Sequence, residues 1–124
     1  MDLNESTIST PDNLIAGASD VIAIPITVAS GQGELPRGQL LGKLTAGGFY
    51  AKCDSATNPQ DGSEVGDVIL CDNIDATDED IVTTGYTIGE FNENAVVFGG
   101  TDTADTHRES LRAKGIILRP SVEP

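Results

Sequence analysis

The sequence predicts a β-rich domain with one short C-terminal α-helix, of a small β-barrel or β-clip-like type, preceded by an extended N-terminal arm. Strand-sized apolar segments are separated at short intervals by turn-forming Gly, Asn and Asp residues. One segment near the C-terminus carries helix-capping signals. The length of 124 residues suits one domain, which we expect at residues 14–124, with the arm at residues 1–13.

The arm is defined by its composition. Residues 1–13 are rich in Ser, Thr, Asn and Asp, and Pro11 lies near their end. Such a segment offers few side chains to a core. We therefore expect it to lie extended outside the domain.

The first strand begins near Val21, where apolar residues recur at every second position. In a strand, alternate residues share a face. The apolar face consists of Ile22, Ile24, Ile26 and Val28. Pro25 has no backbone N–H to donate to a neighbour, so it indicates an edge strand.

A β-hairpin follows a Gly-rich turn in "SGQGELPRG". Its strands are expected around Leu40–Thr45 and Phe49–Cys53, joined by a turn at Ala46-Gly47-Gly48. Two further strands are expected in "VGDVILCD" and "IVTTGYTIGEF", separated by the acidic loop "DATDED".

One helix is expected from about Thr103 to Lys114. Thr106 and Glu109 fit an S/T-x-x-E capping box, and Gly115 stands where a helix-ending glycine belongs. The apolar face is thin, consisting of Ala104, Leu111 and the ring of His107. The helix should therefore cover a sheet edge, and "IIL" at 116–118 should return the chain to a strand that stops at Pro120.

The charge of the chain excludes several classes of partner. Residues 1–107 carry 18 carboxylates and 3 cations, whereas residues 108–124 carry 4 cations and 2 carboxylates, for a total of −13. Nucleic acids and anionic membranes need basic patches, so both are poor partners for this chain. The sequence shows neither a secretion signal nor a membrane-spanning run, and protein partners remain.

Catalysis is not expected. Histidine catalysis needs an orienting carboxylate and a nucleophile or metal, and His107 in a first helical turn is better explained as a capping or partly buried structural residue. Cys53 and Cys71 lack CxxC spacing and cationic neighbours, which favours reduced, structural thiols. We expect neither a cofactor nor a metal.

An acidic loop offers the one alternative to that expectation. Its carboxylates are Asp72, Asp75, Asp78, Glu79 and Asp80. Their spacing departs from the calcium-loop pattern D-x-[DN]-x-[DN]-G, and the glycine of the sharp turn is missing. A solvated acidic loop is the preferred interpretation.

The segment "GEFNENAVVFGGTDTADTHRESLRAKGIIL" resembles the C-terminal region of lambda-type tailed-phage head decoration proteins. The upstream segments "LPRGQLLGKLTAGGFYAKCD", "DGSEVGDVILCD" and "TTGYTIGEF" are similar to that family in the same order. The resemblance covers about residues 14–119. One departure is "EVGDVILCD", where an additional residue lies between the glycine and the apolar strand.

The resemblance implies a β-tulip subunit without enzymatic activity. It implies a homotrimer made in the host cytoplasm that binds the major capsid protein on the outer surface of the expanded capsid and stabilises it. An N-terminal arm that adds to a strand of the capsid protein would use Leu3, Thr7, Ile8, Ser9 and Leu14.

A second contact is expected at the turn that follows the last long strand. Large apolar residues cluster there beside turn-forming Asn and Gly residues, in a chain with few other large apolar groups. We therefore expect an oligomer or capsid interface at Phe91, Asn92, Val97 and Phe98, with the helix bracing them. The alternative for Phe98 is a place in the domain core.

Two other functions stay open at this point. A cellular β-clip module could bind a small ligand or carbohydrate through "LPRGQLLG", which predicts a monomer with a polar pocket. A calcium-dependent interaction domain could use the 72–80 loop, which predicts stabilisation by calcium.

Overall fold

The structure is a computed structural model that describes residues 14–16 and 21–120. Five strands pair in the order β2-β5-β4-β6-β8, and β8 pairs back to β2 to close a barrel. These strands are β2 (Ile22–Val28), β4 (Leu40–Lys43), β5 (Tyr50–Lys52), β6 (Val68–Leu70) and β8 (Ile81–Asn92). A further strand, β9 (Ile116–Arg119), pairs in parallel with the end of β8. The predicted β-rich barrel with one C-terminal helix is confirmed.

Strand β2 is buried in its second half and exposed at its start. Ile26 and Val28 are buried, whereas Ile22 at the start of the strand is exposed. Pro25 pairs with β8 opposite Thr84, but β5 pairs with β2 only at Val28. On the side that faces β5, only Val28 is paired, so the half of β2 that contains Pro25 is an edge on that side. Proline is tolerated there because it has no backbone N–H to donate to a neighbouring strand.

Strand β8 is the longest element and contacts most of the others. It pairs with β2, β6 and β9 along its 12 residues. At Gly85, a Cβ would be directed into the barrel and would lie 2.9 Å from Val68 Cγ2 and 3.1 Å from Ile26 Cδ1. Only glycine allows the opposite walls to approach so closely.

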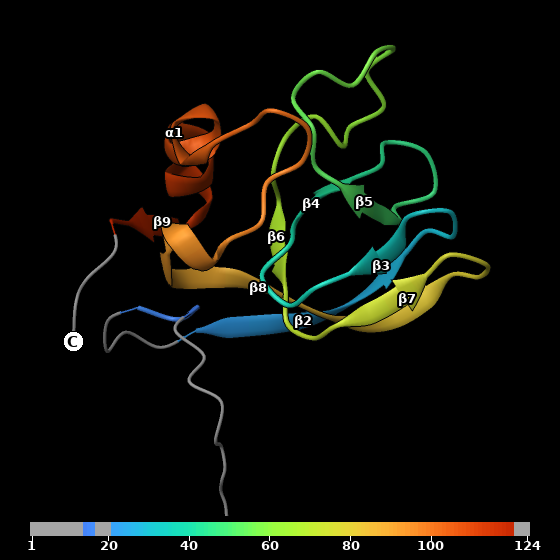
Figure 1. Ribbon diagram of the computed structural model, residues 1–124, viewed down its shortest axis with the longest axis horizontal. Coiled ribbons are helices and arrows are strands. Elements are labelled where there is room, and N and C mark those ends of the chain that lie inside the picture. Colours follow the sequence, from blue (N-terminus) through green and yellow to red (C-terminus); the bar gives the residue numbers. More distant parts are fainter. Residues whose placement is uncertain (1–13, 17–20, 121–124) are drawn as a thin grey trace, which may run out of the picture.

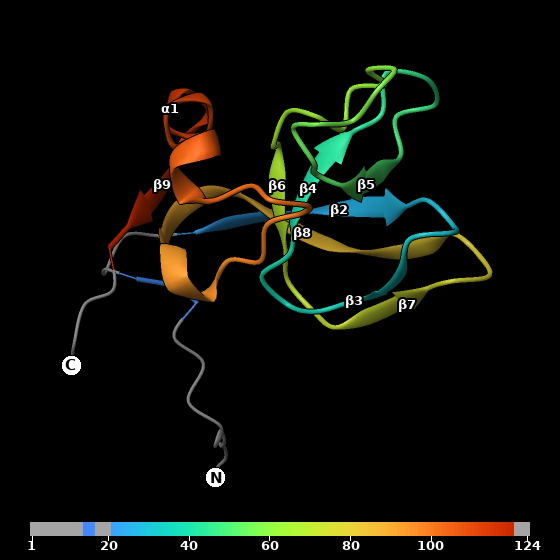
Figure 2. The same ribbon diagram turned by 45° about the horizontal axis from the view of Figure 1, so that its top comes forward.

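The core divides into two clusters because neighbouring residues of a strand point in opposite directions. Leu40 and Ile69 join the cluster beside the helix, whereas Leu41 and Leu70 join the cluster beside β2. In both views of the molecule the helix and β9 lie at one end and the small β3–β7 sheet at the other (Figure 1, Figure 2).

The β3–β7 sheet corrects the sequence interpretation. β3 (Gly33–Leu35) and β7 (Ile74–Ala76) pair antiparallel in segments that the sequence predicts to be a turn and part of the acidic loop. Leu35 and Ala76 are buried against the core. Strands of three residues offer too few positions for an alternating pattern to be detected.

Helix α1 (Ala104–Lys114) has the predicted length, and Gly115 ends it in the left-handed region with φ of 101°. The predicted capping box was placed one turn too late. The N-cap residue is Thr103, and its backbone N–H donates to Thr106 Oγ1 at 3.0 Å. Leu111 and His107 are buried, so the helix covers the end of the barrel with the face that the sequence indicated.

Candidate functional site

The tip segment, residues 89–98, runs from the end of β8 through the 3-10 turn η1 (Glu93–Ala95). Asn92 is only 5% exposed and caps this turn, because its Oδ1 accepts a hydrogen bond from the backbone N–H of Asn94 at 3.1 Å. A short polar side chain at this position favours a tight turn by satisfying its first N–H group. The side chain of Asn92, which the sequence predicts to be at an interface, therefore stabilises the turn that begins after it.

The apolar residues of the tip segment differ in position. Phe91 was expected at an interface, but its ring is fully buried in the core, 5.4 Å from the ring of Tyr86. Phe91 belongs to the core cluster beside the helix, together with Leu14 and Leu111. Val97 is 38% exposed, and Phe98 is half-buried with its ring stacked on that of His107. Val97 thus offers the apolar surface of this segment.

Helix α1 braces the tip segment through Arg108. Its Nη1 donates to Glu93 Oε1 at 2.9 Å and to the carbonyl oxygen of Leu118 at 3.1 Å. One side chain therefore joins the helix, the 3-10 turn and β9. The stacking of Phe98 on His107 adds a second contact between the helix and the tip segment.

The arm root, residues 14–16, lies beside the same part of β8. The backbone N–H of Asn92 donates to the carbonyl oxygen of Leu14 at 2.7 Å, and Ala16 N–H donates to Glu90 O at 2.9 Å. Leu14, which the sequence predicts to be a residue of the capsid-binding arm, is 2% exposed and packs in the core. The other predicted arm residues, Leu3, Thr7, Ile8 and Ser9, lie outside the described residues.

His107 belongs to a polar cluster, with a buried ion pair and the exposed Ser55, that the sequence did not indicate. Its Nε2 lies 2.8 Å from Asp102 Oδ2, and the two side chains are 3% and 5% exposed. Ser55 donates to the same carboxylate from its backbone N–H at 2.8 Å and from Oγ at 2.6 Å. The cluster holds the loop after β5 to the start of the helix.

The pKa of Asp102 reflects this cluster. Burial raises the pKa, but the hydrogen bonds from Ser55 and His107 outweigh burial, so the pKa lies below the ordinary value for Asp. Asp102 therefore acts as a charged acceptor that ties the fold together.

The cysteines lack the features of a reactive site. Both are free and buried. Burial, together with the negative charges of Asp102 and Asp54, raises the pKa of the Cys53 thiol to about 12. A nucleophile needs a depressed pKa, so Cys53 is a core residue that lies 3.9 Å from His107 Nε2.

The two segments behind the alternative functions are engaged within the chain. In "LPRGQLLG", Arg37 Nη1 donates to Cys71 O at 2.8 Å and to Tyr86 Oη at 2.9 Å. In the acidic loop, Asp75 accepts from Thr77, and residues 14–16 and 21–120 contain no group of three His, Cys, Asp or Glu side chains that could hold a metal ion.

The fold and these surfaces define a small closed β-barrel subunit whose polar clusters serve packing. Residues 3–116 match the model of the family described as bacteriophage lambda head decoration protein D. The chain belongs to this family, and it is a phage head decoration protein. A search of curated proteins finds no match. The family identification favours decoration over the cellular ligand-binding module and the calcium-dependent domain.

Membership gives the general partner and location. The family is a structural one, and a head decoration protein associates with the capsid of the virion. Within the described ranges no helix is long and apolar enough to span a membrane.

Proposed function

We propose that this chain binds the outer surface of the expanded phage capsid as a homotrimer, contacts the major capsid protein, and stabilises the shell without catalysing a reaction. It would be made in the host cytoplasm before it joins the virion. The observation that carries the proposal is the family match over residues 3–116, which includes most of the arm as well as the barrel.

The arm root supports a division of labour between barrel and arm. Leu14 and Ala16 hydrogen-bond to β8, so the chain that precedes them starts from a defined point beside the tip segment. An extended arm can satisfy its backbone hydrogen bonds at a sheet edge of the capsid protein, while Leu3 and Ile8 enter pockets there. Thr7 and Ser9 would lie between these anchors.

Stabilisation follows from binding linkage. A ligand that binds only the expanded lattice stabilises that state by RT ln(1 + [L]/Kd) at each site. Three arms on one trimer add avidity, because the second and third contacts are intramolecular. The exposed Val97 would add a contact beside the arm root.

Deletion of residues 1–13 tests the proposal. We expect the truncated protein to keep its melting temperature, because the deletion leaves the buried Leu14 in place. Its binding to expanded empty capsids, measured by co-sedimentation, should weaken by at least about tenfold, because the trimer loses its avidity.

Two matched variants make the test specific. Deletion of residues 1–16 removes Leu14 from the core and should lower the free energy of unfolding by about 2–5 kcal/mol. The full-length variant Leu3→Ser/Ile8→Ser should weaken capsid binding with no change in melting. Binding of the 1–13 deletion as tight as that of the full chain would show that the arm is not an anchor.

A further inference from the structure

We propose that the groove between β2 and the β4–β5 hairpin binds an extended, acidic and aliphatic segment of a protein outside the shell, which adds to β2 as a further strand. The groove lies beside Val28–Tyr50, the pair through which β5 contacts β2. Its cavity of about 420 Å³ lies within the range of about 300–1,000 Å³ that is typical of ligand pockets. Only its place on the outer side of the shell rests on the proposed function.

The backbone of β2 has an open side at the groove. The N–H of Ala29 donates to the carbonyl oxygen of Tyr50 at 2.9 Å, so it points toward β5. Backbone groups alternate in direction along an extended strand, so the N–H groups of Ala23 and Thr27 point to the same side. Within residues 21–120, β5 is the strand on this side of β2, and its pairing starts only beyond Thr27. These two N–H groups are therefore open to an added strand.

This edge lacks the charges that commonly protect an open strand. Natural sheet edges are often blocked by charged residues or proline, because open edges pair with other chains. β2 and the neighbouring residues 81–88 of β8 contain no charged residue, and Pro25 removes only the donor that lies between Ala23 and Thr27. The two remaining donors are about 13 Å apart at ~3.3 Å per residue, which suits an added strand of about five residues. Addition of a peptide strand to such an edge is a common mode of recognition.

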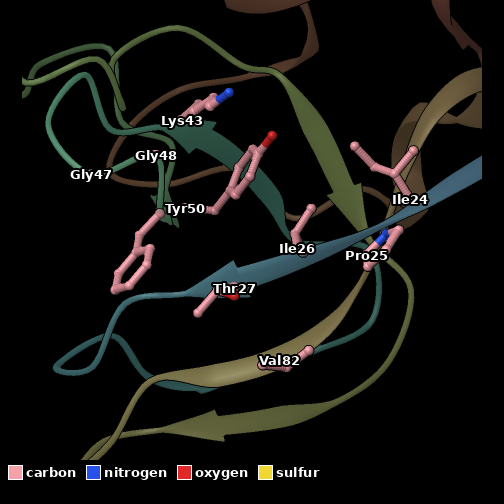
Figure 3. Close-up of a pocket in the computed structure, with 10 residues that line it drawn as sticks. Ile24, Pro25, Ile26, Thr27, Lys43, Gly47, Gly48, Tyr50 and Val82 are labelled. Carbon is pink, nitrogen blue, oxygen red and sulfur yellow. The ribbon is translucent and has the colours of Figure 1, made fainter.

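The floor and rim of the groove suit aliphatic side chains. In Figure 3, Ile26 on β2 is directed toward Tyr50 on the hairpin, and Val82 lies on the neighbouring strand β8. Ile26 and Tyr50 are 5% and 7% exposed, so they form the floor. Val82 and Phe49 are 77% and 37% exposed and form an apolar rim. Alternate side chains of an added strand share one face, and aliphatic ones on that face would cover this floor.

Lys43 supplies the charge that favours an acidic segment. It pairs with Tyr50 across the hairpin, so its side chain stands on the same face as the tyrosine ring. Among the described residues that line the groove, Lys43 is the only charged one. It forms no ion pair with any described residue, whereas four cations near the C-terminus are paired within the chain. A carboxylate on the bound segment would complement its charge.

The groove and the arm root lie at different ends of β8. The arm root bridges Phe91, whereas the groove includes Val82. At ~3.3 Å per residue, the two positions are up to about 30 Å apart along the strand. In the proposed function the arm holds one end of β8 to the shell. The other end, with the groove, is then accessible to a partner outside the shell.

Peptide titration of the full-length protein, followed by two-dimensional NMR of its amide groups, tests the groove. The probe is an acetylated and amidated hexapeptide of alternating Val and Glu. It should shift the amide signals of Ala23 and Thr27 to saturation, because their N–H groups gain acceptors.

Two control peptides separate charge from backbone pairing. A hexapeptide of alternating Val and Lys has the same strand preference but repels Lys43. The acidic peptide with every second backbone nitrogen methylated keeps its side chains but loses the donors of one edge. Each control should bind at least about tenfold more weakly than the acidic probe.

A pair of protein variants tests the role of Lys43. Lys43→Glu should weaken binding of the acidic peptide by at least about fivefold, because the groove then repels it. Arg112→Glu is the matched control, because it makes the same change of charge at a residue of α1 that is 64% exposed and lies outside the groove. It should bind the peptide like the wild-type protein. Circular dichroism checks that both variants are folded.

Co-sedimentation with decorated capsids tests where the groove faces. A fluorescent acidic peptide should sediment with capsids that carry this protein and stay in solution with bare capsids. Peptide binding by the free protein without binding by decorated capsids would overturn the outward position of the groove.

Three other results would overturn the peptide site itself. They are an absence of saturable shifts at millimolar peptide, equal binding of the acidic probe and either control peptide, and equal binding by the Lys43→Glu and Arg112→Glu variants. Each of them leaves the proposed function standing, because capsid binding is measured without peptide. Failure of the wild-type protein to bind capsids would sink the proposed function and leave the titration of the free protein unaffected.

Discussion

At the scale of single residues, His107 shows how a side chain typical of catalysis can serve structure. Its ring fills a site between Phe98 and Asp102, with no activated nucleophile beside it. The Cys53 thiol is the nearest candidate, and its raised pKa keeps it protonated at neutral pH. The sequence indicated a structural histidine, but it could not reveal Asp102 and Ser55 as partners, because the fold alone brings residue 55 next to residue 102.

We expect His107→Ala to lower the free energy of unfolding by about 1.5–3 kcal/mol, the usual contribution of a hydrogen bond to a charged group. Urea denaturation monitored by circular dichroism measures this change. Arg112→Ala is the control on the same helix, because its ion pair with Glu109 is exposed and should contribute less than about 1 kcal/mol. Equal losses in both variants would contradict the structural role of His107. Binding of the folded variant to capsids should stay within a few fold of wild type.

At the scale of elements, the sequence was most informative where a pattern is long. The strand at β2, the hairpin turn at residues 46–48 and the stop at Gly115 each follow from local physical rules and are confirmed, although only Ile26 and Val28 of the predicted apolar face of β2 are buried. The barrel class was predicted, but the pairings that close it, β2 with β8 and Val28 with Tyr50, could not be assigned because they join residues far apart in the sequence. The burial of Leu14 and Phe91 could not be predicted from the sequence, because an apolar residue beside a turn fits a core and an interface equally well.

The start of the helix separates two capping schemes that the sequence allows. Thr106 is the acceptor for the Thr103 N–H in the structure, so Thr106→Ala should lower the free energy of unfolding by about 0.5–2 kcal/mol. Glu109→Ala should change it by less than about 1 kcal/mol, because it removes only the exposed ion pair with Arg112. Thermal melts of both variants provide the comparison. A larger loss for Glu109→Ala would restore the scheme in which Thr106 is the N-cap residue.

At the scale of the whole molecule, charge organises both the fold and its surfaces. The net charge of −13 opposes self-association, yet the cations near the C-terminus are paired within the chain. Arg108, Lys114 and Arg119 join the helix and β9 to the tip segment, β8 and the loop before β6. The charges that remain for partners are therefore mostly carboxylates.

The same distribution predicts how folding stability depends on pH. Protonation of exposed carboxylates reduces repulsion as the pH falls, whereas protonation of Asp102 breaks a buried cluster. The pKa of Asp102 is depressed in the folded state, so its contribution is complete above the unfolded pKa of about 3.9 and is lost as the pH falls through the folded value. A comparison with Asp102→Asn isolates this term from the general charge effect. We expect wild type to be more stable than Asp102→Asn at pH 7, and the difference to shrink steadily below about pH 4, in urea denaturation series at matched ionic strength. A difference that stays constant down to about pH 2 would show that the charge of Asp102 contributes nothing, and that Asn at this position loses only hydrogen-bond geometry.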